Sequence, residues 1–190
     1  FGLECALLQV TAAAHGVAPQ QLLSDGKPWD EPIPVAALLE MAHPDLCSQF
    51  NTRWKEGHRT FKVKIGGDPV IERNATQDLS RRLSEILRIR ARTEWTPCAY
   101  SFRFDANRSL DPARTREWMN DLQAAGLPVE YFEEPMRSME EGPTPGVPLA
   151  LDESLLTLIQ GEHWEASIPN AVRAFVVKPS QFPSLEKLQE

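Results

Sequence analysis

The stretch Tyr100-Ser101-Phe102-Arg103-Phe104-Asp105-Ala106-Asn107 decides the fold that we predict for this chain. Its alternating apolar and polar side chains are typical of a β-strand over residues 100–105. A helix is predicted to follow, because Asp111 suits an N-cap, Pro112 suits the first helical position and Gly126 suits the residue after the last turn. Residues 100–126 are therefore predicted to form one strand followed by one helix.

The same strand–helix unit recurs along most of the chain. Further strands are predicted at residues 33–39, 60–65, 129–132, 148–151 and 174–177, and further helices at 46–55, 70–91 and 155–166, with another beginning at Ser184. The segment between Glu134 and Asp152 is short and rich in Pro and Gly, so a helix there is nearly absent. Strands that alternate with helices favour right-handed crossovers and a parallel sheet.

Two α/β architectures fit this pattern, an open doubly wound sheet and a (β/α)₈ barrel, and the pattern alone does not choose between them. A complete barrel takes about 250 residues. If the chain is a barrel, it holds about six of the eight strand–helix units. Residues 1–32 are predicted to be a helix and a linker rich in Pro and Gly, and residues 33–190 are predicted to be the partial barrel.

Composition limits the partners of the protein. A net charge of −7 over 190 residues, with no cluster of Lys and Arg, argues against nucleic acid. No apolar run approaches the roughly 18 residues that a membrane span needs, so no membrane partner is expected. Cys5, Cys47 and Cys98 are far apart and lack metal-ligand spacing, which favours free thiols in the cytoplasm.

Polar residues recur where the predicted strands end, at the edge where α/β folds bind their ligands. Strand by strand they are Lys62 and Lys64, then Arg103, Asp105 and Asn107, then Glu133 and Glu134, then Asp152, and then Lys178. Each alone has an ordinary structural explanation. Alternating strands are half exposed, single acidic residues often cap helices, and proline often ends a strand.

Side-chain alternation separates charged from apolar residues on two of these strands. The charged set is Lys62, Lys64, Arg103, Asp105 and Asn107, and the apolar set is Phe61, Val63, Ile65, Phe102, Phe104 and Ala106. If the apolar set packs against the helices, the charged set points into the mouth of a barrel. Only one of Glu133 and Glu134 can point the same way, and alternation leaves open which.

The combination of strand ends predicts a metal site. Asp105, one residue of the Glu133-Glu134 pair and Asp152 end three consecutive strands, with lysines on the strands at either side. Three converging carboxylates repel one another unless a cation lies between them. Carboxylate oxygens are the ligands that Mg²⁺ prefers. We therefore expect Mg²⁺ at this edge, with Mn²⁺ as an alternative.

The order of these motifs resembles the muconate-lactonizing subgroup of the enolase superfamily, over roughly residues 33–190. The motifs are Lys-x-Lys at 62–64, Arg-x-Asp-Ala-Asn at 103–107, Glu-Glu-Pro at 133–135, Asp-Glu-Ser at 152–154 and Lys-Pro at 178–179. Within the subgroup, residues 1–7, 103–108, 174–180 and 184–187 resemble the o-succinylbenzoate synthase family. The chain departs at Gln181-Phe182-Pro183, where relatives often have glycine. The resemblance leads us to expect that the N-terminal capping domain and the last two barrel strands are not part of residues 1–190.

The resemblance implies a role for each residue. Asp105, Glu133 and Asp152 would be metal ligands, with Lys64 as the acid/base and Lys62 as its partner. Lys178 would be the opposing lysine, and Arg103 and Asn107 would support the metal and substrate. A Lys or His base working with Mg²⁺ is the established chemistry of enolase-superfamily sites.

The implied activity is that of a carbon–oxygen lyase. Lys64 would remove a proton next to a carboxylate, giving an enediolate, and would return it to a departing hydroxyl on the same face. The small-molecule substrate would be the succinyl-hydroxycyclohexadiene carboxylate of menaquinone biosynthesis. Two alternatives remain at this stage. One is a dipeptide epimerase or N-acylamino-acid racemase of the same superfamily, and the other is a non-catalytic barrel remnant.

Overall fold

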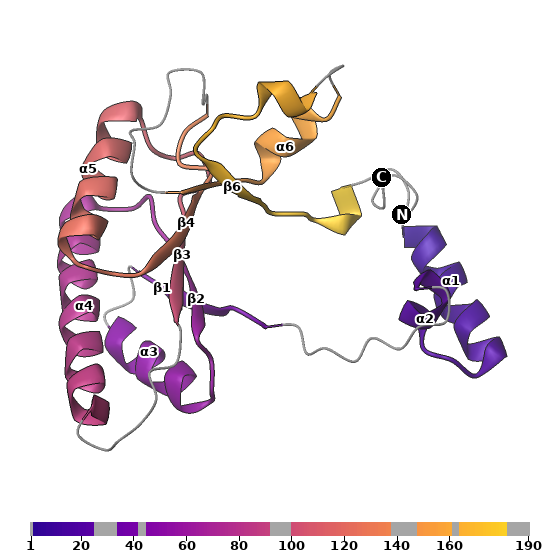
Figure 1. The fold of residues 1–190 in the computed structure, drawn as a ribbon, viewed down its shortest axis with the longest axis horizontal. Coiled ribbons are helices and arrows are strands. Elements are labelled where there is room, and N and C mark those ends of the chain that lie inside the picture. Colours follow the sequence, from indigo (N-terminus) through magenta and orange to yellow (C-terminus); the bar gives the residue numbers. More distant parts are fainter. Residues whose placement is uncertain are drawn as a thin grey trace. The chain divides into compact units, whose positions relative to one another are not determined.

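The chain forms a parallel sheet with helices packed against it (Figure 1). The structure, a computed structural model, describes residues 2–24, 34–41, 45–91, 100–137, 148–160 and 164–181. The chain divides into two compact units. One unit is Val35–Val176, and the other joins Phe1–Pro34 to Val177–Glu190.

The sheet has six strands in the order of the sequence. The strands are β1 (Ala37–Glu40), β2 (Thr60–Lys64), β3 (Ser101–Asp105), β4 (Val129–Glu133), β5 (Leu149–Leu151) and β6 (Val172–Phe175). Each strand pairs in parallel with the next. This is the arrangement that consecutive strand–helix units produce in a barrel, so the predicted α/β class is confirmed.

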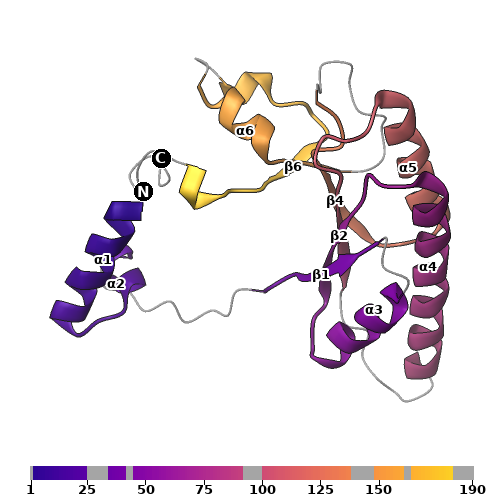
Figure 2. The same cartoon turned by 180° about the vertical axis from the view of Figure 1, so that it is seen from behind.

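Helices follow the strands at nearly the predicted positions. The larger unit contains α3 (Leu46–Lys55), α4 (Pro69–Ala91), α5 (Pro112–Ala124), α6 (Glu153–Leu158) and the 3₁₀ turn η1 (Trp164–Ser167). The side chain of Asp111 caps α5 by accepting the Arg114 backbone N–H at 2.8 Å, as predicted. Helices α3, α4 and α5 lie along one face of the sheet (Figure 2).

The smaller unit contains α1 (Gly2–His15), α2 (Pro19–Leu23) and the 3₁₀ turn η2 (Pro179–Gln181). The predicted first helix is therefore confirmed, and Gly16 follows it with a φ of 66°. The predicted domain boundary between residues 32 and 33 lies outside the described residues, as does the helix predicted from Ser184. Within the described parts of the chain, no helix is both long and apolar enough to cross a membrane.

The core of the larger unit lies between the sheet and its helices. Phe50, Phe61, Phe102 and Phe104 are fully buried there, and neighbouring rings lie 4.8 to 6.2 Å apart between centroids. Offset ring pairs at this spacing add to the free energy gained by burying their area. The aromatic cluster fixes which face of each strand turns toward the helices, and so which face carries charge.

Three predicted elements were wrong in extent. The strand predicted at 33–39 begins at Ala37, where its pairing with Phe61 on β2 begins. The helix predicted at 155–166 ends at Leu158 in the structure, and a separate 3₁₀ turn begins at Trp164. Gly161 lies between them in the sequence, and glycine is costly inside a helix. The strand predicted at 174–177 begins at Val172 instead, because Val172 is buried and pairs with Leu149.

Candidate active site

Strand register brings the predicted site residues into two rows on the face away from the helices. Lys64 aligns with Asp105, and Asp105 aligns with Glu133, at the carboxyl ends of β2, β3 and β4. One row below, Lys62 aligns with Arg103. Residues in register on parallel strands point to the same face. The predicted separation of charged from apolar faces is therefore present.

Lys62 joins two of the carboxylates directly. Its Nζ lies 2.9 Å from Asp105 Oδ2 and 2.8 Å from each carboxylate oxygen of Glu133. Burial lowers the pKa of Lys62, but hydrogen bonds to Glu133 and Asp105 outweigh burial and raise it above its usual value. The ammonium of Lys62 is therefore the cation that compensates this acidic pair in the structure.

The pKa of Glu133 is affected by both of the other predicted ligands, Asp105 and Asp152. The Glu133 side chain is only 1% exposed, and burial raises its pKa despite the hydrogen bond from Lys62. The negative charges of Asp105 and Asp152 raise it further. Asp152, 4% exposed, stands at the N-cap position of α6. Glu133 is thus within electrostatic range of both Asp105 and Asp152.

The carboxylates of Asp105, Glu133 and Asp152 do not surround a common point in the structure. Among the residues that the structure describes, no three His, Cys, Asp or Glu side chains are arranged to hold a metal ion. Lys62 Nζ instead lies between two of the predicted ligands. The donor set nevertheless fits a hard divalent cation, since it consists of buried carboxylate oxygens whose mutual repulsion a cation would relieve.

The two proposed proton-handling lysines lie in different environments. Lys64 is exposed at the end of β2, and no hydrogen bond or ion pair joins it to another described residue. Lys178 belongs to the smaller compact unit, whereas the other predicted site residues belong to Val35–Val176. The role of Lys178 opposite Lys64 therefore stays a prediction.

Arg103 and Asn107 lie near the carboxylates in different ways. Arg103 forms a two-point ion pair with Glu130, with nitrogen–oxygen distances of 3.0 and 2.8 Å, and stacks on the Tyr131 ring at 5.1 Å. The guanidinium of Arg103 thus binds Glu130 and Tyr131, one row below the carboxylates. Asn107 is exposed, and its backbone N–H donates to Asp105 Oδ1 at 3.1 Å.

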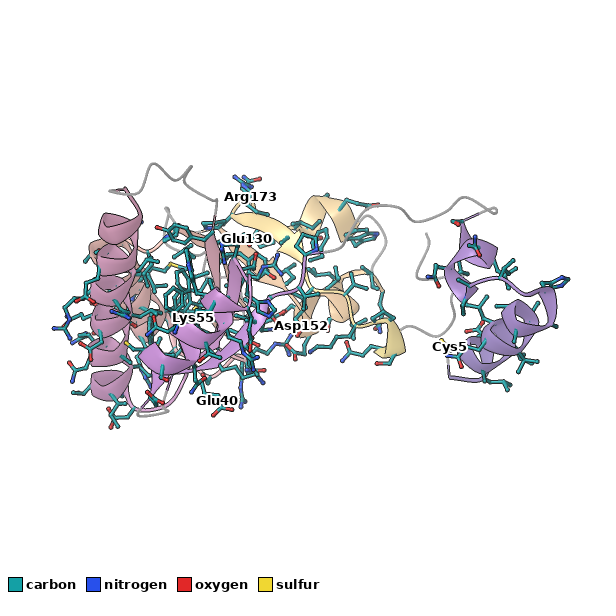
Figure 3. All side chains as sticks on the ribbon, turned by 90° about the horizontal axis from the view of Figure 1, so that it is seen from below. Cys5, Glu40, Lys55, Glu130, Asp152 and Arg173 are labelled. Atoms are coloured by element: carbon teal, nitrogen blue, oxygen red, sulfur yellow. The ribbon has the colours of Figure 1, made fainter. Side chains whose placement is uncertain are left out.

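Two acidic residues of this region, Glu40 and Glu130, were not among those predicted. Glu40 ends β1 in register with Lys64, so the strand-end pattern that selected the other residues applies to it too. Glu130 lies on β4, and Figure 3 shows it, like Asp152, on the side of the sheet away from α4. Glu130 was missed because a bulge in the β3–β4 register, which no sequence pattern marks, brings it to Arg103.

Comparison with known proteins identifies the family. A family model described as "Enolase C-terminal domain-like" matches residues 45–179, which is more than two thirds of the chain. The chain therefore belongs to the enolase C-terminal domain-like family, and the predicted superfamily is confirmed. No curated protein sequence gives a significant match to the chain.

Three solved structures that resemble this chain are enzymes. o-Succinylbenzoate synthase from Thermosynechococcus elongatus BP-1, described with Mg in its active site, is 27% identical over 84% of this chain and 47% of its own, with a TM-score of 0.61. 2-Chloromuconate cycloisomerase from Rhodococcus opacus 1CP is 25% identical over 84% and 41%, with a TM-score of 0.54. Dipeptide epimerase from Methylococcus capsulatus, with Mg ion, is 19% identical over 98% and 51%, with a TM-score of 0.72, which shows the fold alone. The chain spans about half the length of these structures.

Proposed function

We propose that this chain carries the catalytic face of a Mg²⁺-dependent lyase that resembles o-succinylbenzoate synthase. The observation that carries the proposal is the set of buried acids at three successive strand ends, with a lysine ammonium held between two of them. The 27% identity to o-succinylbenzoate synthase favours this reaction within the superfamily. The small-molecule substrate would be the succinyl-hydroxycyclohexadiene carboxylate of menaquinone biosynthesis, acted on in the cytoplasm.

Asp105, Glu133 and Asp152 would hold the metal ion. When bound, Mg²⁺ would supply positive charge that stabilises the negative charge developing on the substrate carboxylate. Lys62 would then turn from the carboxylates toward the substrate side of the sheet, because the cation replaces it as their counter-charge. Mn²⁺ would serve in the same place.

Lys64 would carry the proton transfers. In its neutral form it would take the proton from the carbon next to the substrate carboxylate, and the resulting ammonium would return that proton to the departing hydroxyl on the same face. The carbon–oxygen bond breaks, a carbon–carbon double bond forms and water leaves. Lys178 would stay protonated and stabilise the intermediate electrostatically. Arg103 would hold Tyr131 and Glu130 in the row beneath, and Asn107 would keep the Asp105 carboxylate oriented.

A dipeptide epimerase or N-acylamino-acid racemase is the second candidate function. The same lysines and acidic residues would serve it, with Lys64 and Lys178 exchanging protons on opposite faces of an α-carbon. The similarity to the dipeptide epimerase fold covers 98% of this chain, which keeps the candidate open. Incubation in D₂O separates the two functions, since only the racemase reaction replaces the α-hydrogen of an amino-acid substrate with deuterium.

Replacing Lys64 tests the proposal directly. We expect Lys64→Ala to lower the rate of dehydration in the intact protein by about 10²–10⁴-fold, the usual contribution of a positioned general acid or base. Mg²⁺ binding should remain, since Lys64 contacts neither Asp105 nor Glu133 among the described residues. Lys55→Ala, an exposed lysine at the end of α3, is the matched control. Near-normal turnover by Lys64→Ala would refute the assignment.

A further inference from the structure

Two neighbouring glutamates at the end of β4 face opposite ways. Glu133 binds Lys62 on the charged face, whereas the Glu134 side chain is completely buried among the loops. Glu134 Oε1 accepts the backbone N–H groups of Asp152 at 2.8 Å and Ser154 at 2.7 Å. Glu134 Oε2 accepts the Ser154 hydroxyl at 2.9 Å and Arg108 Nε at 3.1 Å. A carboxylate has about four acceptor positions, and all of them are used here.

These four hydrogen bonds join the segments that follow three successive strands. Arg108 follows β3, Glu134 follows β4, and Asp152 and Ser154 follow β5. Each of the proposed metal ligands lies within three residues of Arg108, Glu134 or Ser154 along the chain. For Asp152 the contact is with its own backbone N–H. The Glu134 carboxylate therefore fixes the spacing of the strand ends that carry the ligands.

Backbone conformation shows that the contacts constrain the loops. Among the described residues, the non-glycine residues with positive φ are Asn107 at 46°, Arg108 at 59° and Glu134 at 38°. Such conformations are unfavourable for residues with a Cβ and persist only where surrounding contacts impose them. Backbone bonds from Arg108 N to Glu134 O (2.7 Å) and from Glu134 N to Ala150 O (3.1 Å) tie the same loops together.

We propose that Glu134 is a positioning residue, which fixes the backbone positions from which the carboxylates of Asp105, Glu133 and Asp152 would bind a divalent cation in place of Lys62. The inference rests on the metal site of the proposed function. Glu134 touches none of the three carboxylates through its own carboxylate, and it acts through the backbone that carries them. Outer partners of metal ligands typically change metal affinity by about 10–100-fold.

The test measures Mg²⁺ itself rather than turnover. Glu134→Gln keeps the side-chain shape but offers Arg108 and Ser154 an amide in place of an oxygen. We expect titration calorimetry on the intact protein to give at least about tenfold weaker Mg²⁺ binding than wild type. The rise in Tm on adding Mg²⁺ should shrink accordingly, whereas a merely structural residue would lower the Tm equally with and without the metal.

Glu72→Gln is the matched control. Glu72 is also a buried glutamate, 2% exposed, and its Oε1 accepts the backbone N–H groups of Gly66 at 2.7 Å and Gly67 at 2.8 Å. The loop that it holds follows Lys64 and carries none of the proposed metal ligands. We expect Glu72→Gln to lower the Tm while leaving the Mg²⁺ dissociation constant and the Mg²⁺-induced rise in Tm unchanged.

Ser154→Ala tests the positioning role of Glu134 without changing the charge of any residue. It also provides the test if Glu134→Gln fails to fold. It removes one donor to Glu134 without altering any charge, so weaker Mg²⁺ binding, by roughly threefold, would report spacing alone. Wild-type Mg²⁺ affinity in Ser154→Ala, or in folded Glu134→Gln, would overturn the positioning role while leaving the metal site in place. Failure of the wild-type protein to bind Mg²⁺ would instead overturn the proposed function, and the inference with it.

Discussion

The two faces of the sheet are stabilised by different physical effects. The face toward α3, α4 and α5 is apolar, and Phe61, Val63 and Phe102 on it have no exposed surface. The other face is a set of charged side chains whose positions depend on one another, since Lys62 holds Asp105 and Glu133 together. Apolar burial is roughly proportional to area and indifferent to direction. Ion pairs at this depth require specific geometry and specific partners.

The comparison explains why the two faces tolerate change differently. On the apolar face, a side chain can be replaced by another of similar volume with little loss of stability. On the charged face, removal of one partner leaves the others buried and uncompensated, and the proposed metal ion would take the place of the missing charge. Substitutions on the apolar face should therefore change stability alone, and those on the charged face should change the response to Mg²⁺.

Phe102→Ala should have the largest effect on stability. Phe102 is fully buried and lies 5.5 Å from the Phe61 ring and 6.2 Å from the Phe104 ring between centroids. Truncating such a side chain costs about 3–5 kcal/mol, from lost burial and the cavity left behind. Denaturant unfolding would measure the loss. Phe175→Ala removes the same atoms where the ring is 44% exposed, and an equal loss there would contradict the comparison.

The apolar face could be predicted almost completely from the sequence. Residues 46–55 were predicted as a helix, and α3 spans Leu46–Lys55. The alternation of Phe61, Val63 and Ile65 with Lys62 and Lys64 also matches their burial, because a strand packed on helices must alternate. Local patterns sufficed, since each side chain needed only to be apolar and on the correct face.

The charged face could be predicted only in part. The order of the strand ends predicted that Lys62, Asp105 and one residue of the Glu133-Glu134 pair are neighbours. Alternation could not choose between the two glutamates, and only the family resemblance implied Glu133. The structure shows Glu133 facing Lys62 and Glu134 facing Ser154. The contacts of Glu134 and of Glu130 join loops or strands about 20 to 30 residues apart. A pattern within one strand or helix cannot predict contacts between residues so far apart in the sequence.

Lys62→Met should have the next largest effect on stability. It leaves Asp105 and Glu133 buried without their shared counter-charge, which should cost roughly 1–3 kcal/mol. Added Mg²⁺ should recover more stability in this variant than in wild type, because the ion supplies the missing charge. Thermal unfolding with and without Mg²⁺ would measure this recovery. Lys55→Met, at an exposed lysine, should show no gain of this kind, and equal Mg²⁺ responses in the two variants would refute the compensating role of Lys62.

Gly66→Ala tests the turn that follows β2. Gly66 has a φ of 111°, and a Cβ there would lie 3.0 Å from Ser109 Cβ and closer to its hydroxyl. We expect a loss of stability of about 1–3 kcal/mol from backbone strain together with this contact. Gly57→Ala is the matched control, since Gly57 has a φ of 100° and open space around it. The Ser109 contact is irrelevant if both variants lose the same amount in denaturant unfolding.

Glu130→Gln should give the smallest effect, and it depends on pH. The hydrogen bond from Arg103 is the main cause that lowers the pKa of Glu130 below its ordinary value of 4.5, so the folded state favours the ionised carboxylate. The pair therefore adds stability above pH 4.5 and loses it as the pH falls through the lower pKa of the folded state. Because both side chains are partly exposed, the contribution should stay below about 1 kcal/mol. Wild type should be slightly more stable than Glu130→Gln at neutral pH, and the difference should vanish in acid. A difference that grows in acid would mean that Arg103 is held by another group, and that the row beneath the carboxylates is not fixed by this pair.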